Sequence, residues 1–138
     1  MNDGRYLHTA TLLDTGEVLV AGGLQFNPNT IFSSAEVYNP RTSAFTGTGS
    51  LSLARYQHTA TLLANGKAMI AGGWDGSSSS ASTEIYDPTA SSFSHTGDLN
   101  IARFDHTATL LQNGTVLVVG GIGSSGTLAS AEIYTPAP

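Results

Sequence analysis

The sequence contains no cysteine, few basic residues and no long apolar run, and each absence excludes a class of protein. Without cysteine there are no disulfides, thiolate metal sites or cysteine nucleophiles, and the cellular compartment stays open. Five Lys and Arg against ten Asp and Glu give a net charge of −5. We therefore expect neither a nucleic-acid nor an anionic-membrane surface. No stretch approaches the roughly 20 apolar residues of a membrane-spanning helix.

Most of the chain consists of three copies of one pattern. Nineteen residues beginning at Arg5 return at Arg55 and Arg103, and they read RYLHTATLLDTGEVLVAGG, RYQHTATLLANGKAMIAGG and RFDHTATLLQNGTVLVVGG. Each copy continues to a Glu-x-Tyr-x-Pro segment, and the first two then reach Phe45 and Phe93. The copies start 50 and 48 residues apart, and the whole difference lies between the Gly pair and the Glu. This period predicts a repeat architecture in which one loop varies.

Each copy is expected to form β-strands and no helix. The segment HTATLL and the run that ends in the Gly pair are rich in β-forming residues, and Asn-Gly separates them in the second and third copies. Asn-Gly between two such runs predicts a hairpin with a type I′ turn, in which both central residues have positive φ. The Glu-x-Tyr segment forms a third strand that ends at proline, and the segment around the Phe forms a fourth. Because these strands are apolar or small on both faces, the sheets should be covered on both sides.

Four antiparallel strands every 48 to 50 residues predict the blades of a β-propeller. The Gly pair, the Glu-x-Tyr-x-Pro segment and the fourth-strand aromatic resemble kelch repeats, of the sort also found in galactose oxidase-type propellers. Phe stands here where that family usually has Trp. We expect an all-β chain forming a single repeat domain of three kelch-like blades at residues 5–54, 55–102 and 103–138, the last without a fourth strand.

The alternating strand direction predicts which ends of the strands lie together. The starts of the first strands and the loops after the Gly pairs share one face, called the top face below, and the Asn-Gly turns lie on the opposite, bottom face. The kelch resemblance implies that the first strand lines the central channel. The residues then expected nearest the axis are the ring of Arg5, Arg55, Arg103, His8, His58 and His106.

Two interpretations of this ring are open. The Arg side chains could hold an anionic group by bidentate contacts. Alternatively, each Arg pairs with the carboxylate of its own copy (Glu36, Glu84 or Glu132), and each His bonds within its own turn. Identical repetition favours the structural interpretation, because every blade has the same packing problem whereas a ligand seldom has matching symmetry. The Gly pairs are expected to permit close approach of neighbouring blades.

The loops after the Gly pairs are the second candidate site, because variation is confined to them. The first-choice contact residues are Phe26 and Asn27 in the first loop and Trp74 and Asp75 in the second. An aromatic beside a short polar residue suits a sugar or a peptide. The alternative is that these aromatics pack over neighbouring blade edges.

We expect a non-catalytic binding or scaffold module with a protein or glycan ligand on the top face and without cofactor or metal. An enzyme is the alternative, since propellers of the type resembled include a copper-radical oxidase and a sialic-acid mutarotase. The oxidase cofactor needs a Tyr crosslinked to Cys, which is absent. A mutarotase-like activity needs only an acid–base pair, for which Asp105 is the candidate base. A duplicated or designed propeller fragment without an evolved ligand is a third alternative.

Three blades are too few for a closed propeller, which typically has four to eight. The outer faces of the first and third blades would be exposed apolar sheet, which favours association. Two chains related by a two-fold axis supply six blades. We therefore expect a homodimer in which the third blade of each chain packs on the first blade of the other.

Overall fold

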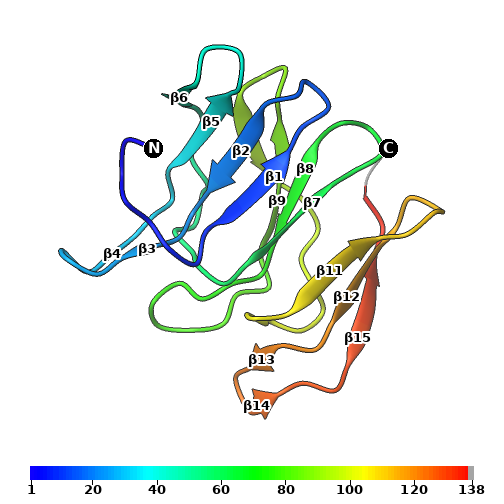
Figure 1. Cartoon of the computed structure of the whole chain (residues 1–138). Helices are drawn as coiled ribbons and strands as arrows, with labels where there is room; N and C mark the ends of the chain where they lie inside the picture. Colours follow the sequence, from blue (N-terminus) through cyan, green and yellow to red (C-terminus); the bar gives the residue numbers. More distant parts are fainter. Residues whose placement is uncertain (137–138) are drawn as a thin grey trace.

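The computed structural model describes residues 1–136, which form three antiparallel sheets and two short hairpins (Figure 1). The first sheet has the order β1 (Thr9–Leu12), β2 (Val18–Ala21), β5 (Ala35–Asn39), β6 (Ala44–Gly47). The second has the order β7 (Thr59–Leu62), β8 (Ala68–Ala71), β9 (Thr83–Asp87), β10 (Ser92–His95). The third has the order β11 (Thr107–Leu110), β12 (Val116–Val119), β15 (Ala131–Tyr134). The hairpins are β3 (Leu24–Gln25) with β4 (Thr30–Ile31), and β13 (Ile122–Gly123) with β14 (Gly126–Thr127).

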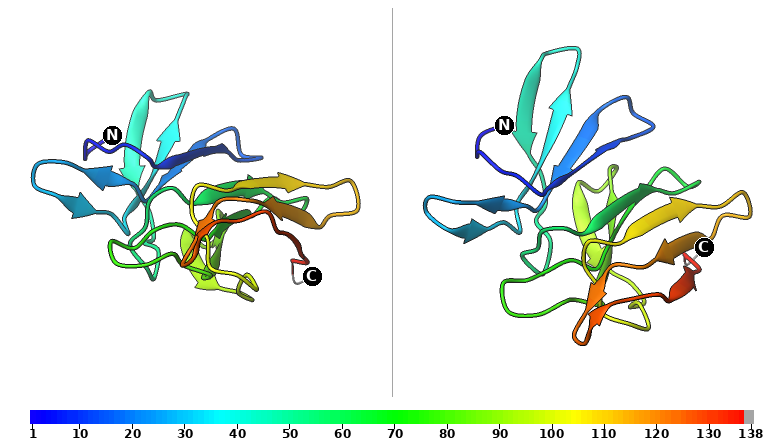
Figure 2. Two further views of the ribbon diagram at one scale, coloured as in Figure 1. Left: turned by 90° about the horizontal axis from the view of Figure 1, so that it is seen from below. Right: turned by 60° about the horizontal axis from the view of Figure 1, so that its bottom comes forward.

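The three sheets are arranged as blades, with the first strand of each sheet innermost. Strand β7 lies against β1 on one side and β11 on the other. Figure 2 shows the remaining strands of each sheet extending away from these three, with the second sheet between the first and the third. The predicted all-β architecture of antiparallel blades is confirmed, and the third sheet has three strands in the described part of the chain. Residues 137 and 138, the end of the predicted third blade, lie outside the described residues.

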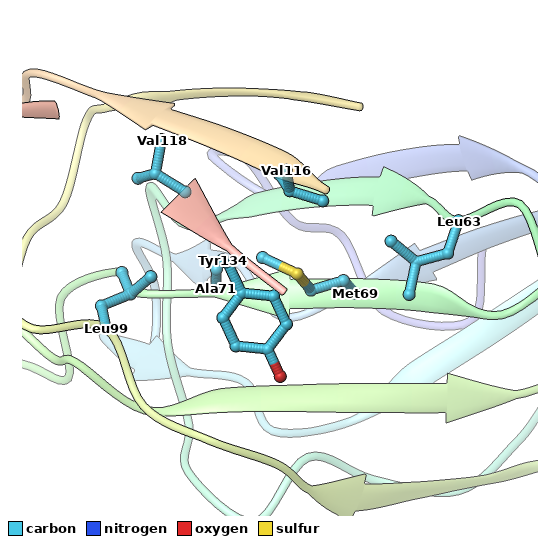
Figure 3. Packing of buried hydrophobic residues seen from close by; sticks show 7 residues of the cluster. All are labelled: Leu63, Met69, Ala71, Leu99, Val116, Val118 and Tyr134. Atoms are coloured by element: carbon cyan, nitrogen blue, oxygen red, sulfur yellow. The ribbon is translucent and has the colours of Figure 1, made fainter. Parts of the chain in front are cut away.

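The core consists of two apolar clusters, each between neighbouring sheets. Between the first and second sheets lie Leu13, Leu19, Ala21, Ala35, Ala68 and Tyr86. Between the second and third lie Leu63, Met69, Ala71, Leu99, Val116, Val118 and Tyr134 (Figure 3). Because both faces of the second sheet are covered, β8 is buried along its whole length. Residues 1–136 contain no helix long and apolar enough to cross a membrane.

The hairpin turn between the first two strands differs from the predicted type I′ turn. In the second copy only Gly66 has positive φ (+78°), whereas Asn65 does not. The Leu63 N–H donates to the Lys67 carbonyl (2.8 Å), and the Gly66 N–H donates to the Leu63 carbonyl (3.0 Å). Three residues therefore form the loop, which is the pattern of a type I turn followed by a glycine in the left-handed region. Asn65 keeps a negative φ, and its Oδ1 accepts the Lys67 N–H (3.2 Å). This bond stabilises the three-residue loop.

Candidate functional site

A buried Arg–Glu pair occupies the same place in each sheet. In the second sheet, Arg55 Nη2 lies 2.9 Å from Glu84 Oε1, and the two side chains are 0% and 2% exposed. Arg55 Nη1 donates to the carbonyls of Gly72 (2.9 Å) and Ser82 (2.8 Å), Nη2 also donates to Ser82 Oγ (3.0 Å), and Nε donates to the Leu53 carbonyl (3.3 Å). Burial lowers the pKa of the Arg55 guanidinium, and the Glu84 carboxylate opposes this effect. All five N–H groups of Arg55 are thus engaged inside the chain.

The other two sheets repeat this pair. Arg103 lies 2.9 Å from Glu132, and Arg5 lies 3.2 Å from Glu36. The predicted pairing of each Arg with the Glu of its own copy is therefore confirmed. Arg103 uses its donors as Arg55 does, whereas the buried Nε of Arg5 has no partner among the described residues. An anion could reach the guanidinium groups of Arg55 and Arg103 only by displacing bonds that hold the sheet together, which supports the structural interpretation.

The second and third histidines join neighbouring sheets. A hydrogen bond of 2.9 Å links His58 Nε2 to Thr9 Oγ1 of the first sheet, and one of 3.0 Å links His106 Nε2 to Thr59 Oγ1 of the second. Both rings are buried, at 5% and 7% exposed. The expectation that each His bonds within its own turn is wrong. The glycine of the preceding sheet leaves room for the ring, since a Cβ on Gly22 would lie 2.7 Å from His58 Cε1.

The same burial keeps these imidazoles neutral. Burial lowers the pKa of His58 to about 3, and the neighbouring Arg55 charge lowers it further. Burial and the Arg103 charge lower the pKa of His106 to about 4. His8, the residue at the same position in the first sheet, is half-buried, and burial lowers its pKa as well. Neutral rings carry no positive charge. The buried histidines therefore do not add to an anion-binding site formed by the Arg side chains.

The first two Gly pairs lie where the backbones of neighbouring sheets approach each other closely. A Cβ on Gly22 would lie 2.6 Å from the Arg55 carbonyl oxygen, and the Gly23 N–H donates to that oxygen (2.8 Å). Gly73 makes the same bond to the Arg103 carbonyl at the next junction (2.8 Å). The predicted role of the Gly pairs in close approach between blades is confirmed for the first two pairs.

The loops after the Gly pairs lie on the face where the first strands begin. Antiparallel bridges join the residue after each Arg to the residue after each Gly pair, namely Tyr6 to Leu24, Tyr56 to Trp74 and Phe104 to Ile122. The two short hairpins, β3–β4 and β13–β14, belong to these loops. Figure 1 shows both hairpins at the ends of the sheets away from the β1–β2 and β11–β12 turns. The variable loops and the ring residues therefore share the top face.

The two aromatic loop residues differ in what they leave exposed. Phe26 is 78% exposed and stacks on Tyr6, with ring centroids 4.7 Å apart and planes 13° from parallel. Asn27 beside it is exposed. Trp74 is half-buried and meets Phe104 of the third sheet edge to face, at 5.0 Å and 66°. The first loop presents an aromatic face to solvent, whereas the second loop folds onto the neighbouring sheet.

The two acidic candidates have different surroundings. The Asp75 carboxylate accepts two backbone N–H bonds within its own loop, at 2.7 and 2.8 Å, and these bonds lower its pKa. Asp105 is exposed, and its N–H donates to the Gln57 carbonyl (3.0 Å), just as the Gln57 N–H donates to the Leu7 carbonyl (3.1 Å). Residues 1–136 contain no cluster of three or more His, Asp or Glu side chains that could hold a metal ion.

Comparison with known proteins yields one family match, and it covers the second sheet. Residues 55–100 match the family model of the Kelch motif. The chain contains a kelch motif. The first sheet repeats the strand order of this motif, and both flanking sheets repeat its Arg–Glu pair and its Gly pair. No curated protein matches the chain.

Several residues that fix the kelch blades against each other were missed in the sequence. They are the Thr partners of the histidines, described above, and an outer pair at each junction. Tyr86 Oη lies 2.8 Å from Thr48 Oγ1 of the preceding sheet, and Tyr134 Oη lies 2.6 Å from Thr96 Oγ1. The signal was present, because each Thr stands at a fixed register in its copy. Spacing alone does not reveal that its partner belongs to the next blade.

Proposed function

We propose that the chain is a non-catalytic binding module whose kelch scaffold presents the top-face loops to a protein ligand. One observation carries the proposal: the loop whose length varies between copies exposes Phe26, and this ring stacks on Tyr6 of the repeated segment beside it. Aromatic residues such as Phe and Tyr are enriched at the contact residues of protein interfaces, and the Asn27 amide beside them adds a polar contact. Loops on a rigid scaffold are also where binding residues concentrate.

The surroundings of the titratable groups favour binding over catalysis. The guanidinium groups of Arg55 and Arg103 are fully engaged, and His58 and His106 are buried at junctions between sheets. None of these four residues is therefore a free acid partner for Asp105. Hollows of about 280, 400 and 220 Å³ lie toward the bottom turns and outer edges of the sheets, away from Asp105, whereas enzymes usually place catalytic groups in such concave sites.

A glycan is the second candidate ligand. The flat, solvent-facing ring of Phe26, held parallel to Tyr6, is a surface on which a sugar ring can stack, and the Asn27 amide beside it offers both a donor and an acceptor. The same two residues would carry both kinds of contact. A direct comparison of peptide and glycan probes therefore separates the two candidates.

The test is a selection of the chain against a displayed peptide library and, in parallel, a glycan array. A selected peptide should bind the Phe26→Ser variant at least tenfold more weakly than the parent. The matched control is Arg41→Ala, an exposed residue in a bottom turn, which should bind as the parent does. Retention on glycans alone would favour the second candidate.

Two outcomes would overturn the proposal. One is that neither probe set yields a ligand. The other is that the amide shifts caused by a bound peptide map to the bottom turns around Gly66 and Gly114. Circular dichroism of each variant shows whether a loss of binding reflects the contact or a loss of fold.

A further inference from the structure

We propose that the open face of the third sheet binds the open face of the first sheet in a second copy of the chain, through the contacts that already join the sheets inside it. This surface is distinct from the top-face loops, so the inference does not depend on the proposed ligand. The two junctions within the chain use the same set of contacts twice, and the two open faces carry a third set of the same groups.

The apolar part of a junction is present on both open faces and is exposed there. Val119 of the third sheet is 39% exposed, whereas Ala71 at the same register in the second sheet is 0% exposed. Ile133 of β15 is 51% exposed. On the first sheet, Leu12 is 63% exposed, while Leu62 at the same register is half-buried beneath its neighbour. Exposed apolar side chains gathered in this way indicate an interaction surface.

The donor and the acceptor of the backbone hydrogen bond at a junction also lie on different open faces. Each junction inside the chain has a Gly N–H that donates to an Arg carbonyl: Gly23 to Arg55 and Gly73 to Arg103, both at 2.8 Å. The donor of the next set is the Gly121 N–H, which has no acceptor within residues 1–136. The acceptor of the next set is the Arg5 carbonyl, which receives no glycine N–H in the same range.

The two partners of the His–Thr side-chain bond are also found separately on the two open faces. His58 is bonded to Thr9 and His106 to Thr59. The remaining members are Thr107, whose side chain is exposed at the start of β11, and His8, which is half-buried. Neither makes such a bond among the described residues. A second copy would supply His8 to Thr107, as each sheet in the chain supplies its His to the sheet before it.

The third sheet also keeps the space that a following sheet would fill. Gly120 has φ of +67°, close to the +63° of Gly22 and the +64° of Gly72. A Cβ on Gly22 would clash with the next sheet, but the nearest atom to one on Gly120 is the Leu128 carbonyl oxygen at 3.6 Å. The position is shaped like the other two and is open.

A second copy fits these faces, because the Arg5 carbonyl and His8 of its first sheet match the Gly121 N–H and Thr107 of the third sheet. Two copies bring six sheets, within the four to eight of closed propellers. A two-fold axis then makes both junctions identical and leaves no open face. The closed form also continues the row of backbone bonds on the top face that runs from Asp105 to Gln57 and from Gln57 to Leu7.

The first experiment measures mass by light scattering on a sizing column at micromolar concentration. The expected mass is twice 14.2 kDa. Gly120→Asn, which fills the open space with a residue that tolerates positive φ, should give a folded monomer. The control is Gly114→Asn, at φ +83° in a bottom turn with no atom within 4 Å, which should remain a dimer. A folded parent monomer overturns the proposal and means that something else, such as further sheets of a longer chain, covers the faces.

A second experiment uses the absence of cysteine and does not need Gly120→Asn to fold. Leu7→Cys and Asp105→Cys are placed in one chain, because these two ends of the backbone-bonded row are expected to be neighbours only across the junction between copies. Oxidation should give one band of twice the chain mass on a non-reducing gel, and neither single variant should give it. A ladder of larger species would show an open filament and overturn the closed dimer. Absence of any crosslinked band would overturn the interface itself.

Discussion

At the scale of single residues, Glu84 shows why a carboxylate persists in an apolar strand. Its Oε1 pairs with Arg55, and its Oε2 accepts the N–H of Ser52 (2.8 Å), which belongs to the connection entering the second sheet. Asn100 donates to Glu132 (2.6 Å) and Asn2 to Glu36 (2.8 Å) in the same way. Each Glu thus ties the incoming chain to the Arg that braces its sheet.

Removing this charge should destabilise the fold. We expect Glu84→Gln to lower the free energy of unfolding by about 1–4 kcal/mol, because it leaves a buried Arg without its counter-charge. The measurement is urea unfolding followed by circular dichroism. The control is Asp87→Asn, whose partner Lys67 lies 2.9 Å away with a side chain 42% exposed, and its effect should be much smaller. Equal midpoints for Glu84→Gln and the parent would return the Arg residues to the candidate binding site.

The buried histidines predict a loss of stability in mild acid. The folded pKa values of His58 and His106 are about 3 and about 4, below the ordinary 6.5 of an unfolded chain. The unfolded state therefore takes up protons first, so the stabilisation is complete above pH 6.5 and is lost as pH falls toward the folded values. Each residue should contribute up to about 1.4 kcal/mol per pH unit in this window.

Unfolding free energies measured between pH 7.5 and 5 test this expectation, because ordinary carboxyl groups titrate mostly below that range. The His106→Gln variant, whose amide can still reach Thr59, should have a shallower slope than the parent. A parent slope of zero across the window, or an unchanged slope in His106→Gln, would contradict the burial argument.

At the scale of elements, the sequence predicts strands better than it predicts turns and junctions. The period, the apolar runs and the Glu within each third strand were enough to place the blades and the Arg–Glu pairs. The type I′ turn was wrong because Asn-Gly also fits a longer loop in which only Gly66 has positive φ. The hairpins β3–β4 and β13–β14 were missed because their strands have two residues each. The Thr9–His58 bond was missed because its two residues belong to different blades.

The close approach of two sheets at Gly22 gives a prediction at this scale. Gly22→Ala should destabilise more than Gly114→Ala, although both positions have positive φ, +63° and +83°. The Gly114 variant should cost about 1–2 kcal/mol for its backbone conformation alone, since its surroundings are open. The Gly22 variant adds overpacking against the Arg55 carbonyl, about 1–3 kcal/mol more. Urea midpoints of the two variants decide this, and equal midpoints would mean that the junction yields easily.

At the scale of the whole molecule, the chain is a row of similar junctions, so its stability depends on how many of them are made. The second sheet is covered on both faces and supplies the most fully buried strand, β8. The first and third sheets each have one face on the core and one face that bears exposed Leu12 or Val119 and Ile133. In a repeat of this kind, each added neighbour contributes an interface that an isolated arc lacks.

If a second copy supplies the missing junction, folding and association are linked and the melting temperature must depend on protein concentration. We expect the midpoint to rise steadily as the concentration of the parent chain is raised from 1 to 100 μM, because mass action favours the state with two additional junctions. Differential scanning fluorimetry across that series measures it. Gly114→Asn should show the same dependence, displaced to lower temperature by its own strain, whereas Gly120→Asn should have a midpoint independent of concentration. A parent midpoint that stays constant over the whole range would show that three sheets fold and persist as a monomer, with Leu12, Val119 and Ile133 in contact with water.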